Sequence, residues 1–329
     1  MENILITGGA GFIGYHLAVK LLSKGYKIDL IDDFSRGVND KFLKEITAEK
    51  QVKLIDANLL HYKISDTIGN DYTYVYHLAG VVGVQHVLKA PYNVLVKNIE
   101  LLKNAIIIGR KQKKLKRFIF TSTSEVYAGT LENFDLQFPT PETSPLSIPN
   151  LEDKRTPYML SKIYGEALCT HSNLPFTIIR PHNFYGPRMG LSHVIPQLLK
   201  KAYESKNGKL NVYSVNHKRS FCFIKDAIEM MVLLSENKNA FGETYNIGNQ
   251  QDEISITELA KNIIEVVGKD LEINPLSDSN DSIMRRCPDM MKTINLDVFK
   301  TNYMLKDGIK MTFDWYRKNI FENKDFSAV

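Results

Sequence analysis

A glycine-rich turn near the N-terminus constrains the fold more than any other feature of the sequence. The apolar run Asn3 to Thr7 leads into Gly8-Gly9-Ala10-Gly11-Phe12-Ile13-Gly14, and leucines then recur at helical spacing up to Gly25. A second apolar run, Ile28 to Ile31, ends in Asp32. A strand, a glycine turn, a helix, a second strand and an acid in this order predict a βαβ unit.

The residues of this turn suit a dinucleotide. Gly8 and Gly11 let the backbone turn tightly and approach a pyrophosphate, and Gly14 lets the helix pack closely. The N–H groups at the start of the helix, around Phe12 and Ile13, have no partner within the helix and attract phosphate charge. We therefore predict dinucleotide binding in preference to a purely structural turn.

The acid after the second strand bears on which dinucleotide binds. Asp32 stands eighteen residues beyond Gly14. Its carboxylate can accept hydrogen bonds from an adenosine ribose and would repel a ribose phosphate. NAD is therefore favoured over NADP, although Arg36 nearby weakens that preference.

Further short apolar runs alternate with helical segments. The predicted strands are Val52 to Ile55, Tyr74 to Leu78, Phe118 to Thr121 and Phe176 to Ile179, and the helices between them include Tyr92 to Ile108 and Pro157 to Cys169. This alternation predicts an α/β fold, a Rossmann-type doubly wound parallel sheet. Ligands of such sheets bind beyond the carboxyl ends of the strands.

The pattern changes after Arg180. Leu210 to Phe223 resembles strands, Ile195 to Tyr203 and Ile256 to Val267 resemble helices, and a last helix is predicted from Met311 to Asn319. The βαβ rhythm is absent there. We predict an NAD-binding domain of residues 1–179 plus about 224–250, with a smaller mixed α/β lobe of about 180–223 plus 251–329 that binds the substrate.

Composition excludes several classes of protein. The formal charge of +5 is small for 329 residues, and no basic run is interleaved with aromatic residues as nucleic-acid grooves require. The three cysteines have no metal-ligand spacing and suit a reducing compartment. With neither a signal-peptide pattern nor an apolar run of membrane-spanning length, we expect a cytoplasmic protein that binds neither membranes nor nucleic acid.

Tyr158 and Lys162 are the candidate catalytic pair. They stand four residues apart in a predicted helix and so share one face. An ammonium beside the phenol would lower the pKa of the phenol towards the range useful for a general base. A surface pair without function is the alternative that these two residues alone leave open.

A polar stretch follows one predicted strand at its carboxyl end. Thr123, Ser124 and Glu125 come directly after the run that ends at Thr121. Their hydroxyls and carboxylate can hydrogen-bond a polyol, and Glu125 can move a proton. Ordinary capping of a loop by Ser and Thr is the alternative.

Taken together, these residues resemble the extended short-chain dehydrogenase/reductase family, the NAD-dependent nucleotide-sugar epimerases, dehydratases and decarboxylases. The resemblance runs from Ile4 to about Tyr316. Its marks are Thr7 to Gly14, Asp56, His77-Leu78-Ala79-Gly80, Asn98, Thr123 with Val126-Tyr127, Tyr158 with Lys162, Arg180, Asn183 to Arg188, Arg219-Ser220-Phe221, Asp226 and Tyr245 to Asn249.

The resemblance implies a mechanism and a set of site residues. Tyr158 would take the proton of the sugar C4 hydroxyl while hydride goes to NAD, Lys162 would hold the phenolate and the nicotinamide ribose, and Thr123 would bond the reacting oxygen. NAD would contact the glycine turn, Asp32, Asp56, Ala57, Leu78, Ala79, Gly80, Asn98, Tyr158 and Lys162. The substrate would contact Asn183, Arg219, Arg286 and His86. His182 also falls in the cleft, and Arg188 is expected to be structural or at an outward-facing rim.

Glu125 should decide which reaction follows the oxidation. We predict that it is a catalytic acid/base and that a nucleotide-diphosphate sugar, with UDP favoured, loses water. UDP-glucuronate decarboxylases also carry Thr-Ser-Glu and an arginine matched by Arg286 in Arg286-Cys287-Pro288-Asp289. The loop from Arg180 to Asn183 and the segment Pro139 to Arg155 depart from the decarboxylase pattern. Epimerisation at C4 is the third option.

Two further expectations concern the whole protein. A dinucleotide-binding regulator without catalysis is the alternative from another class, against which intact Tyr158, Lys162 and Thr123 argue. In the resembled family, helices that correspond to 93–110 and 158–170 form an interface between subunits. We therefore expect a homodimer.

Overall fold

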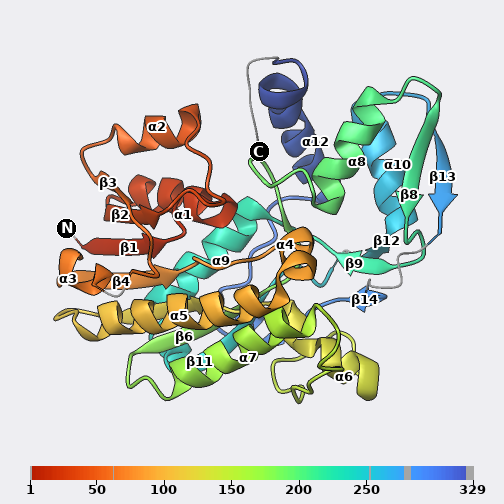
Figure 1. Cartoon of the computed structure of the whole chain (residues 1–329). Helices are drawn as coiled ribbons and strands as arrows, with labels where there is room; N and C mark the ends of the chain where they lie inside the picture. Colours follow the sequence, from red (N-terminus) through yellow and green to blue (C-terminus); the bar gives the residue numbers. More distant parts are fainter. Residues whose placement is uncertain (1, 62, 252, 278–282, 324–329) are drawn as a thin grey trace.

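A computed structural model describes residues 2–61, 63–251, 253–277 and 283–323 (Figure 1). Its centre is a seven-stranded sheet with the order β11-β6-β5-β4-β1-β2-β3, in which all neighbours are parallel. The strands are β1 (Asn3–Thr7), β2 (Lys27–Asp32), β3 (Val52–Asp56), β4 (Tyr72–His77), β5 (Arg117–Thr121), β6 (Phe176–Pro181) and β11 (Glu243–Ile247). The prediction of a doubly wound parallel sheet is confirmed.

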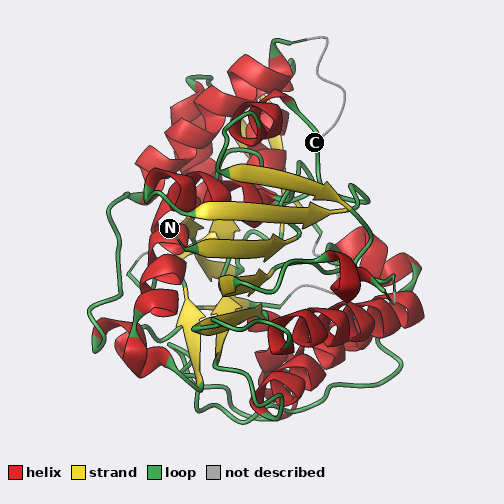
Figure 2. Cartoon of the chain, turned by 90° about the vertical axis from the view of Figure 1, so that its left-hand side faces the viewer, coloured by secondary structure: helices red, strands yellow, loops and turns green. Residues whose placement is uncertain are grey.

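Helices cover both faces of this sheet (Figure 2). The helices of this part of the chain are α1 (Phe12–Ser23), α2 (Lys41–Thr47), α3 (Ile64–Thr67), α4 (Val84–Lys89), α5 (Pro91–Arg110), α6 (Ala128–Asn133), α7 (Thr156–Thr170) and α9 (Ile224–Glu236), of which α4 and α6 lie away from the sheet faces (Figure 1). Ile4 and Ile6 of β1 face the core that includes α1 and α9, whereas Leu5 faces the core that includes α5. This alternation explains why β1 reads as an unbroken apolar run, since both of its faces are buried.

The second half of the chain carries three small sheets. They pair β7 (Phe184–Tyr185) with β10 (Cys222–Phe223), β8 (Lys209–Tyr213) with β13 (Glu272–Leu276), and β9 (Lys218–Ser220) with β12 (Glu253–Ser255) and β14 (Arg285–Arg286). The helices are α8 (Val194–Glu204), α10 (Ile256–Val267), α11 (Met291–Ile294) and α12 (Leu305–Tyr316).

One sequence expectation for this half is confirmed and one needs correction. The stretch from Leu210 to Phe223 forms parts of the strands β8, β9 and β10, as predicted, whereas α12 begins at Leu305, six residues before the predicted start. The pair β8 and β13 is parallel, but the chain between them passes through α9, through β11 of the main sheet and through α10, so this pair is not a simple βαβ unit. Since β11 belongs to the main sheet, we keep the proposed division into two lobes.

Within the described ranges, no helix combines the length and the apolar character needed to cross a bilayer.

Candidate active site

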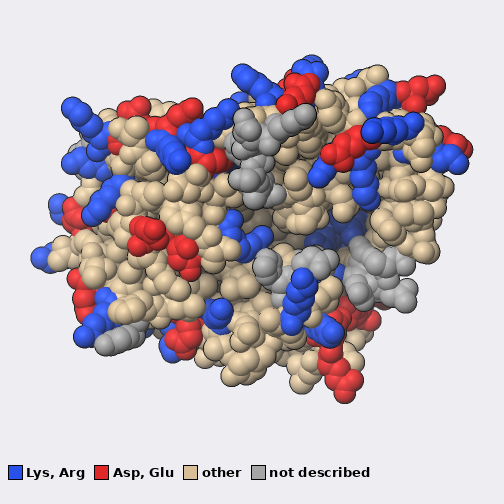
Figure 3. Space-filling model, turned by 45° about the horizontal axis from the view of Figure 1, so that its top comes forward, with Lys and Arg blue, Asp and Glu red and all other residues tan. Residues whose placement is uncertain are grey.

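The carboxyl ends of β1, β2, β4 and β5 meet at one edge of the sheet because these strands are parallel. The glycine turn follows β1, and the 3₁₀ turn Ser124–Tyr127 follows β5. A hollow on the face shown in Figure 3 has Lys and Arg atoms at its floor. The candidate site therefore combines strand ends with a surplus of positive charge.

The turn after β1 tolerates only glycine at two positions. Gly8 has a φ of 73°, and a Cβ there would lie 2.8 Å from the backbone nitrogen of Ala79. A Cβ on Gly14 would lie 2.3 Å from the carbonyl oxygen of Gly8. The helix therefore starts directly against the turn. Gly11 caps α1 without a side-chain bond, and no acid stands in the first turn of that helix, so its N–H groups face outward for an anion.

Asp32 helps to build this turn. Its Oδ2 accepts the N–H of Ala10 at 2.9 Å, and its Oδ1 accepts the N–H of Phe34 at 2.9 Å. Burial raises the pKa of the carboxyl group, and the two backbone bonds oppose that effect. Asp56 ends the neighbouring strand opposite Asp32, and the N–H of Ala57 bonds the Asp32 carbonyl at 3.1 Å. Contact with the ribose stays a prediction.

The loop after β4 forms the other wall. Leu78 donates its N–H to the Thr7 carbonyl at 3.1 Å, and Ala79 donates to the Thr7 hydroxyl at 3.3 Å. Asn98 accepts the N–H of Val81 at 2.7 Å and donates to its carbonyl at 3.1 Å. Asn98 therefore shapes the wall, while its direct contact with a cofactor is untested.

This geometry fits NAD. The turn at the uncapped N-terminus of α1 lacks side chains at Gly8, Gly9 and Gly11, and beside it a Cβ on Gly80 would stand 3.5 Å from Asn98 Oδ1 and 3.7 Å from Lys162 Nζ. Backbone can approach a ligand closely there. The residues predicted to hold NAD thus border one continuous region of the strand ends.

Tyr158 and Thr123 are brought together. Tyr158 lies in the first turn of α7, and its hydroxyl is hydrogen-bonded to Thr123, the cap of the turn after β5. Burial raises the pKa of the phenol to about 12, while the Thr123 bond and the guanidinium groups of Arg286 and Arg36 lower it. The pair is arranged to bind one hydroxyl oxygen between them.

The Lys162 amine bonds the end of β5 rather than the Tyr158 phenol. Its Nζ donates to the Thr121 carbonyl at 2.8 Å and lies 5.1 Å from the centre of the Phe120 ring. Burial lowers the pKa of the amine to about 8. The expected lowering of the Tyr158 pKa by Lys162 is therefore not what this structure shows, because the amine is engaged with the end of β5.

Glu125 lies between arginines. Arg286 of β14 donates to Glu125 Oε1, and Arg155 Nη2 lies 3.4 Å from the same oxygen. The side chains are only 17%, 18% and 23% exposed for Glu125, Arg286 and Arg155. Burial would raise the pKa of Glu125, but the guanidinium groups of Arg286, Arg155 and Arg219 together hold it below its usual range. Glu125 is therefore ionised at neutral pH.

The predicted substrate residues have different surroundings. Burial and the neighbouring Arg286 lower the pKa of Arg219 to about 9, which indicates positive charge in excess. Asn183 donates its amide to the Ser220 carbonyl at 2.8 Å and ties the loop after β6 to β9. Arg286 faces Glu125. His86 lies in α4, and its side chain is outside the described part of the structure.

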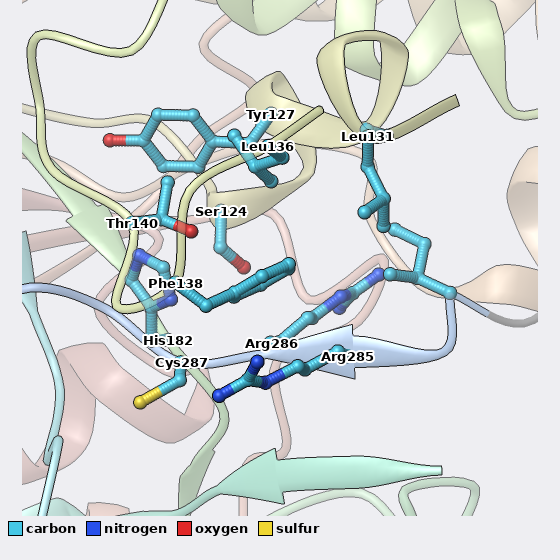
Figure 4. A pocket seen from close by; sticks show the side chains of 12 residues that line it. Ser124, Tyr127, Leu131, Leu136, Phe138, Thr140, His182, Arg285, Arg286 and Cys287 are labelled. Atoms are coloured by element: carbon cyan, nitrogen blue, oxygen red, sulfur yellow. The ribbon is translucent and has the colours of Figure 1, made fainter. Parts of the chain in front are cut away.

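A small cavity adjoins Glu125 (Figure 4). Ser124, Phe138, His182 and Arg286 converge on it from four segments, and about 20 Å³ is open to the centre of a water-sized molecule, roughly the space that one water needs. His182 Nε2 bonds Asn246 Oδ1 at 3.0 Å, and burial lowers the pKa of the ring to about 3. Within the described residues, His182 Nδ1 and Arg286 Nε have no hydrogen-bond partner.

Sequence reasoning missed two positions near the site. The Glu166 carboxylate accepts two hydrogen bonds from the Arg180 guanidinium, at 2.9 and 2.6 Å, and one from the Ser122 hydroxyl at 2.6 Å. These bonds anchor α7 to the ends of β5 and β6. Glu166 stands four residues after Lys162, and this spacing indicates that the two side chains share one face of the helix. Arg155 stands three residues before Tyr158, so the same helical periodicity pointed to it.

Arg188 needs a correction. It does not face outward, since its side chain is 3% exposed and its Nε lies 2.7 Å from Asp40 Oδ2. The guanidinium also lies 4.2 Å from the centre of the Tyr15 ring. Arg188 therefore ties the second lobe to the loop that precedes α2, which is a structural role.

A family model described as the NAD-dependent epimerase/dehydratase family matches residues 4–248. The chain belongs to this family. The UDP-N-acetyl-alpha-D-glucosaminuronate decarboxylase of Bacillus cytotoxicus is 31% identical over 333 residues, which cover 96% of this chain and 98% of that protein. The dTDP-D-glucose 4,6-dehydratase of Dictyostelium discoideum is 31% identical over 280 residues, which cover 81% of this chain and 62% of that protein.

A solved structure with NAD also resembles the chain. The UDP-glucuronic acid 4-epimerase of Bacillus cereus, in complex with UDP-glucuronic acid and NAD, is 27% identical with a TM-score of 0.79, covering 96% of this chain and 99% of that one. NAD is thus the cofactor of this family. The three relatives are a decarboxylase, a dehydratase and an epimerase, so similarity leaves the reaction open.

Proposed function

We propose that the protein is an NAD-dependent decarboxylase of a UDP-hexuronate, a nucleotide sugar with a carboxylate at C6. The observation that carries this proposal is the cluster of Arg286, Arg155 and Arg219 around Glu125. Three guanidinium groups against one carboxylate leave a net positive charge. A second carboxylate, that of the substrate, would offset it.

The ionised state of Glu125 makes dehydration, which we predict from the sequence, the weaker reading. Elimination of water needs a group that removes the proton next to the ketone and a group that protonates the departing hydroxyl. A carboxylate held ionised by Arg286 and Arg155 is a poor proton donor and a weakened base. Decarboxylation needs Glu125 neither as a proton donor nor as a base, because the bond between C5 and the carboxylate carbon breaks once C4 is a ketone.

The chain's own residues provide for the remaining steps. When bound, NAD supplies the capacity to accept hydride from C4 and to return it. Tyr158 takes the proton of the C4 hydroxyl, and Thr123 hydrogen-bonds the same oxygen. After the C5–C6 electron pair moves into the C4 carbonyl and carbon dioxide leaves, these hydroxyls stabilise the negative charge on O4. C5 then takes one proton from solvent.

The arginines position the substrate carboxylate. Arg286 and Arg155 already bind the Glu125 carboxylate, so an added carboxylate would share or exchange these donors. Arginine suits this task because its planar fork gives paired hydrogen bonds. We assign Arg286 to the reacting end of the sugar, and we keep Arg219 and Asn183 as proposed contacts to the nucleotide diphosphate.

Product mass tests the proposal. The purified protein is incubated with UDP-N-acetylglucosaminuronate, UDP-glucuronate and the neutral sugar UDP-glucose, and each product is followed by mass spectrometry. We expect carbon dioxide to be lost from a uronate and UDP-glucose to stay unchanged. Loss of water from UDP-glucose, or conversion of a uronate without mass change, would overturn the proposal in favour of dehydration or epimerisation.

A further inference from the structure

Arg36 crosses over the glycine turn. It lies in the loop after β2, and its Nη1 donates a hydrogen bond to the backbone carbonyl of Val82 in the loop after β4. In the sheet, β1 lies between β2 and β4. A side chain that joins the two outer loops must therefore pass above the carboxyl end of β1, where the turn from Gly8 to Gly14 begins.

The surroundings of Arg36 leave its charge uncompensated. Its partner Val82 contributes a neutral carbonyl, and among the described residues no carboxylate oxygen lies within 4.0 Å of the guanidinium. Gly83 adjoins it with a φ of 98°, and a Cβ there would come to 3.4 Å from Arg36 Nη2. The Arg36 guanidinium therefore lies against the loop after β4 without a carboxylate partner among the described residues.

An anion fits the space between Arg36 and α1. Below lie the N–H groups of an uncapped helix N-terminus without an acid in its first turn. Above lies a guanidinium, which pairs with phosphate oxygens through two parallel hydrogen bonds. We propose that Arg36 is a strap across the cofactor site, which binds the NAD pyrophosphate from the side opposite α1 and must release Val82 for NAD to enter or leave.

The direction of the side chain decides between two uses of this arginine. A contact with a ribose 2′-phosphate would require Arg36 to stay beside Asp32 at the end of β2. The guanidinium instead reaches β4, on the side of β2 away from β3. It therefore points across the dinucleotide site, and it gives no support to NADP.

The strap also lies near the catalytic phenol. Arg36 lowers the pKa of Tyr158, and burial lowers the pKa of Arg36 itself, an effect that the Tyr158 phenol opposes. The other groups acting on the phenol are the Thr123 hydroxyl and Arg286, which lower its pKa, and Glu125, which raises it. Loss of the Arg36 charge should therefore move the pH midpoint of C4 oxidation upward.

The rate of NAD dissociation tests the strap without any sugar. Wild type and Arg36→Gln are purified identically, the bound nucleotide is quantified after acid precipitation, and release of NAD is followed after dilution. Charge-assisted hydrogen bonds of this kind predict release faster by about ten- to hundredfold. Lys44→Gln is the matched control, because it removes an exposed positive charge from α2 directly after the same loop.

The outcomes separate the possibilities. Faster release in Arg36→Gln alone, with unchanged circular dichroism and thermal midpoint, supports the strap, and Arg36→Lys should recover part of the retention. Equal release from wild type and Arg36→Gln overturns it, as does an equal effect of Lys44→Gln. A variant that loses discrimination between NAD and NADP but retains NAD normally would also overturn it. Because no sugar is present, these results do not depend on the proposed decarboxylation.

Discussion

Replacement of Glu125 by glutamine removes the carboxylate that faces the arginine cluster formed by Arg155, Arg219 and Arg286. Gln keeps the size of the side chain and one hydrogen-bond acceptor, so the change isolates the charge. Removing one partner of a buried ion pair costs about 3–5 kcal/mol. Because Glu125 and Arg286 are 17% and 18% exposed, we expect about 2–3 kcal/mol.

This destabilisation should depend on pH. The pKa of Glu125 is held below its usual range in the folded protein. Its contribution to the free energy of unfolding is therefore fully present above the unfolded pKa of about 4.3 and is lost as the pH falls through the folded pKa. Glu125→Gln should lower the thermal midpoint by roughly 3–4 °C at pH 7, and the difference from wild type should shrink only as the pH falls below about 4.

Thermal unfolding with ligands completes the assay. UDP-glucuronate should raise the thermal midpoint of Glu125→Gln more than that of wild type, because its carboxylate refills the vacated cluster, whereas UDP-glucose should raise both equally. Asp40→Asn is the control, since Asp40 is 2% exposed and pairs with Arg188, outside the cluster. A pH-independent loss of stability, or equal gains from the two sugars, would refute the charge argument. Full turnover of Glu125→Gln would exclude any part for Glu125 in the chemistry.

Three further predictions follow from other contacts. Tyr158→Phe should slow sugar-dependent reduction of the nicotinamide, read by absorbance, by about 10²–10⁴-fold while NAD stays bound, and a rate near that of wild type would contradict its role as the base. Arg188→Met should lower the free energy of unfolding by about 3–5 kcal/mol in denaturant titration, because it leaves Asp40 buried without its partner, and a change under 1 kcal/mol would contradict this account. Tyr92 and Tyr164 are 75% and 50% exposed on α5 and α7, so Tyr164→Glu should convert the proposed homodimer to a monomer in light scattering, and a monomeric wild type or a dimeric variant would contradict this interface.

Local periodicity made part of the site predictable. Gly8 and Gly14 stand where a strand passes into a helix, and the structure shows that a Cβ at either would collide with backbone. The spacing of Tyr158 and Lys162 placed them correctly in one helix. The engagement of Lys162 with the Thr121 carbonyl was not predictable, because the spacing of residues in a helix says nothing of which neighbouring strand end an amine reaches.

The arginine cluster depends on contacts that no local pattern encodes. Glu125 and Arg286 are 161 residues apart, and they meet because the two-residue strand β14 pairs with β9. Strands this short carry no detectable alternation. Arg36 was ambiguous for a similar reason, since only the order of β4, β1 and β2 shows which way its loop faces.

The contact between Glu125 and the arginines has a consequence for affinity. Glu125 acts as an internal competitor that occupies the donors proposed for the substrate carboxylate. The measured binding free energy then reflects the difference between the ion pair that the substrate forms and the Glu125 ion pair that it replaces, and not the strength of the new ion pair alone. A neutral sugar ring cannot displace the competitor and gains nothing from Arg155 and Arg286. Selectivity for uronates would in this way arise without a residue that repels the wrong substrate.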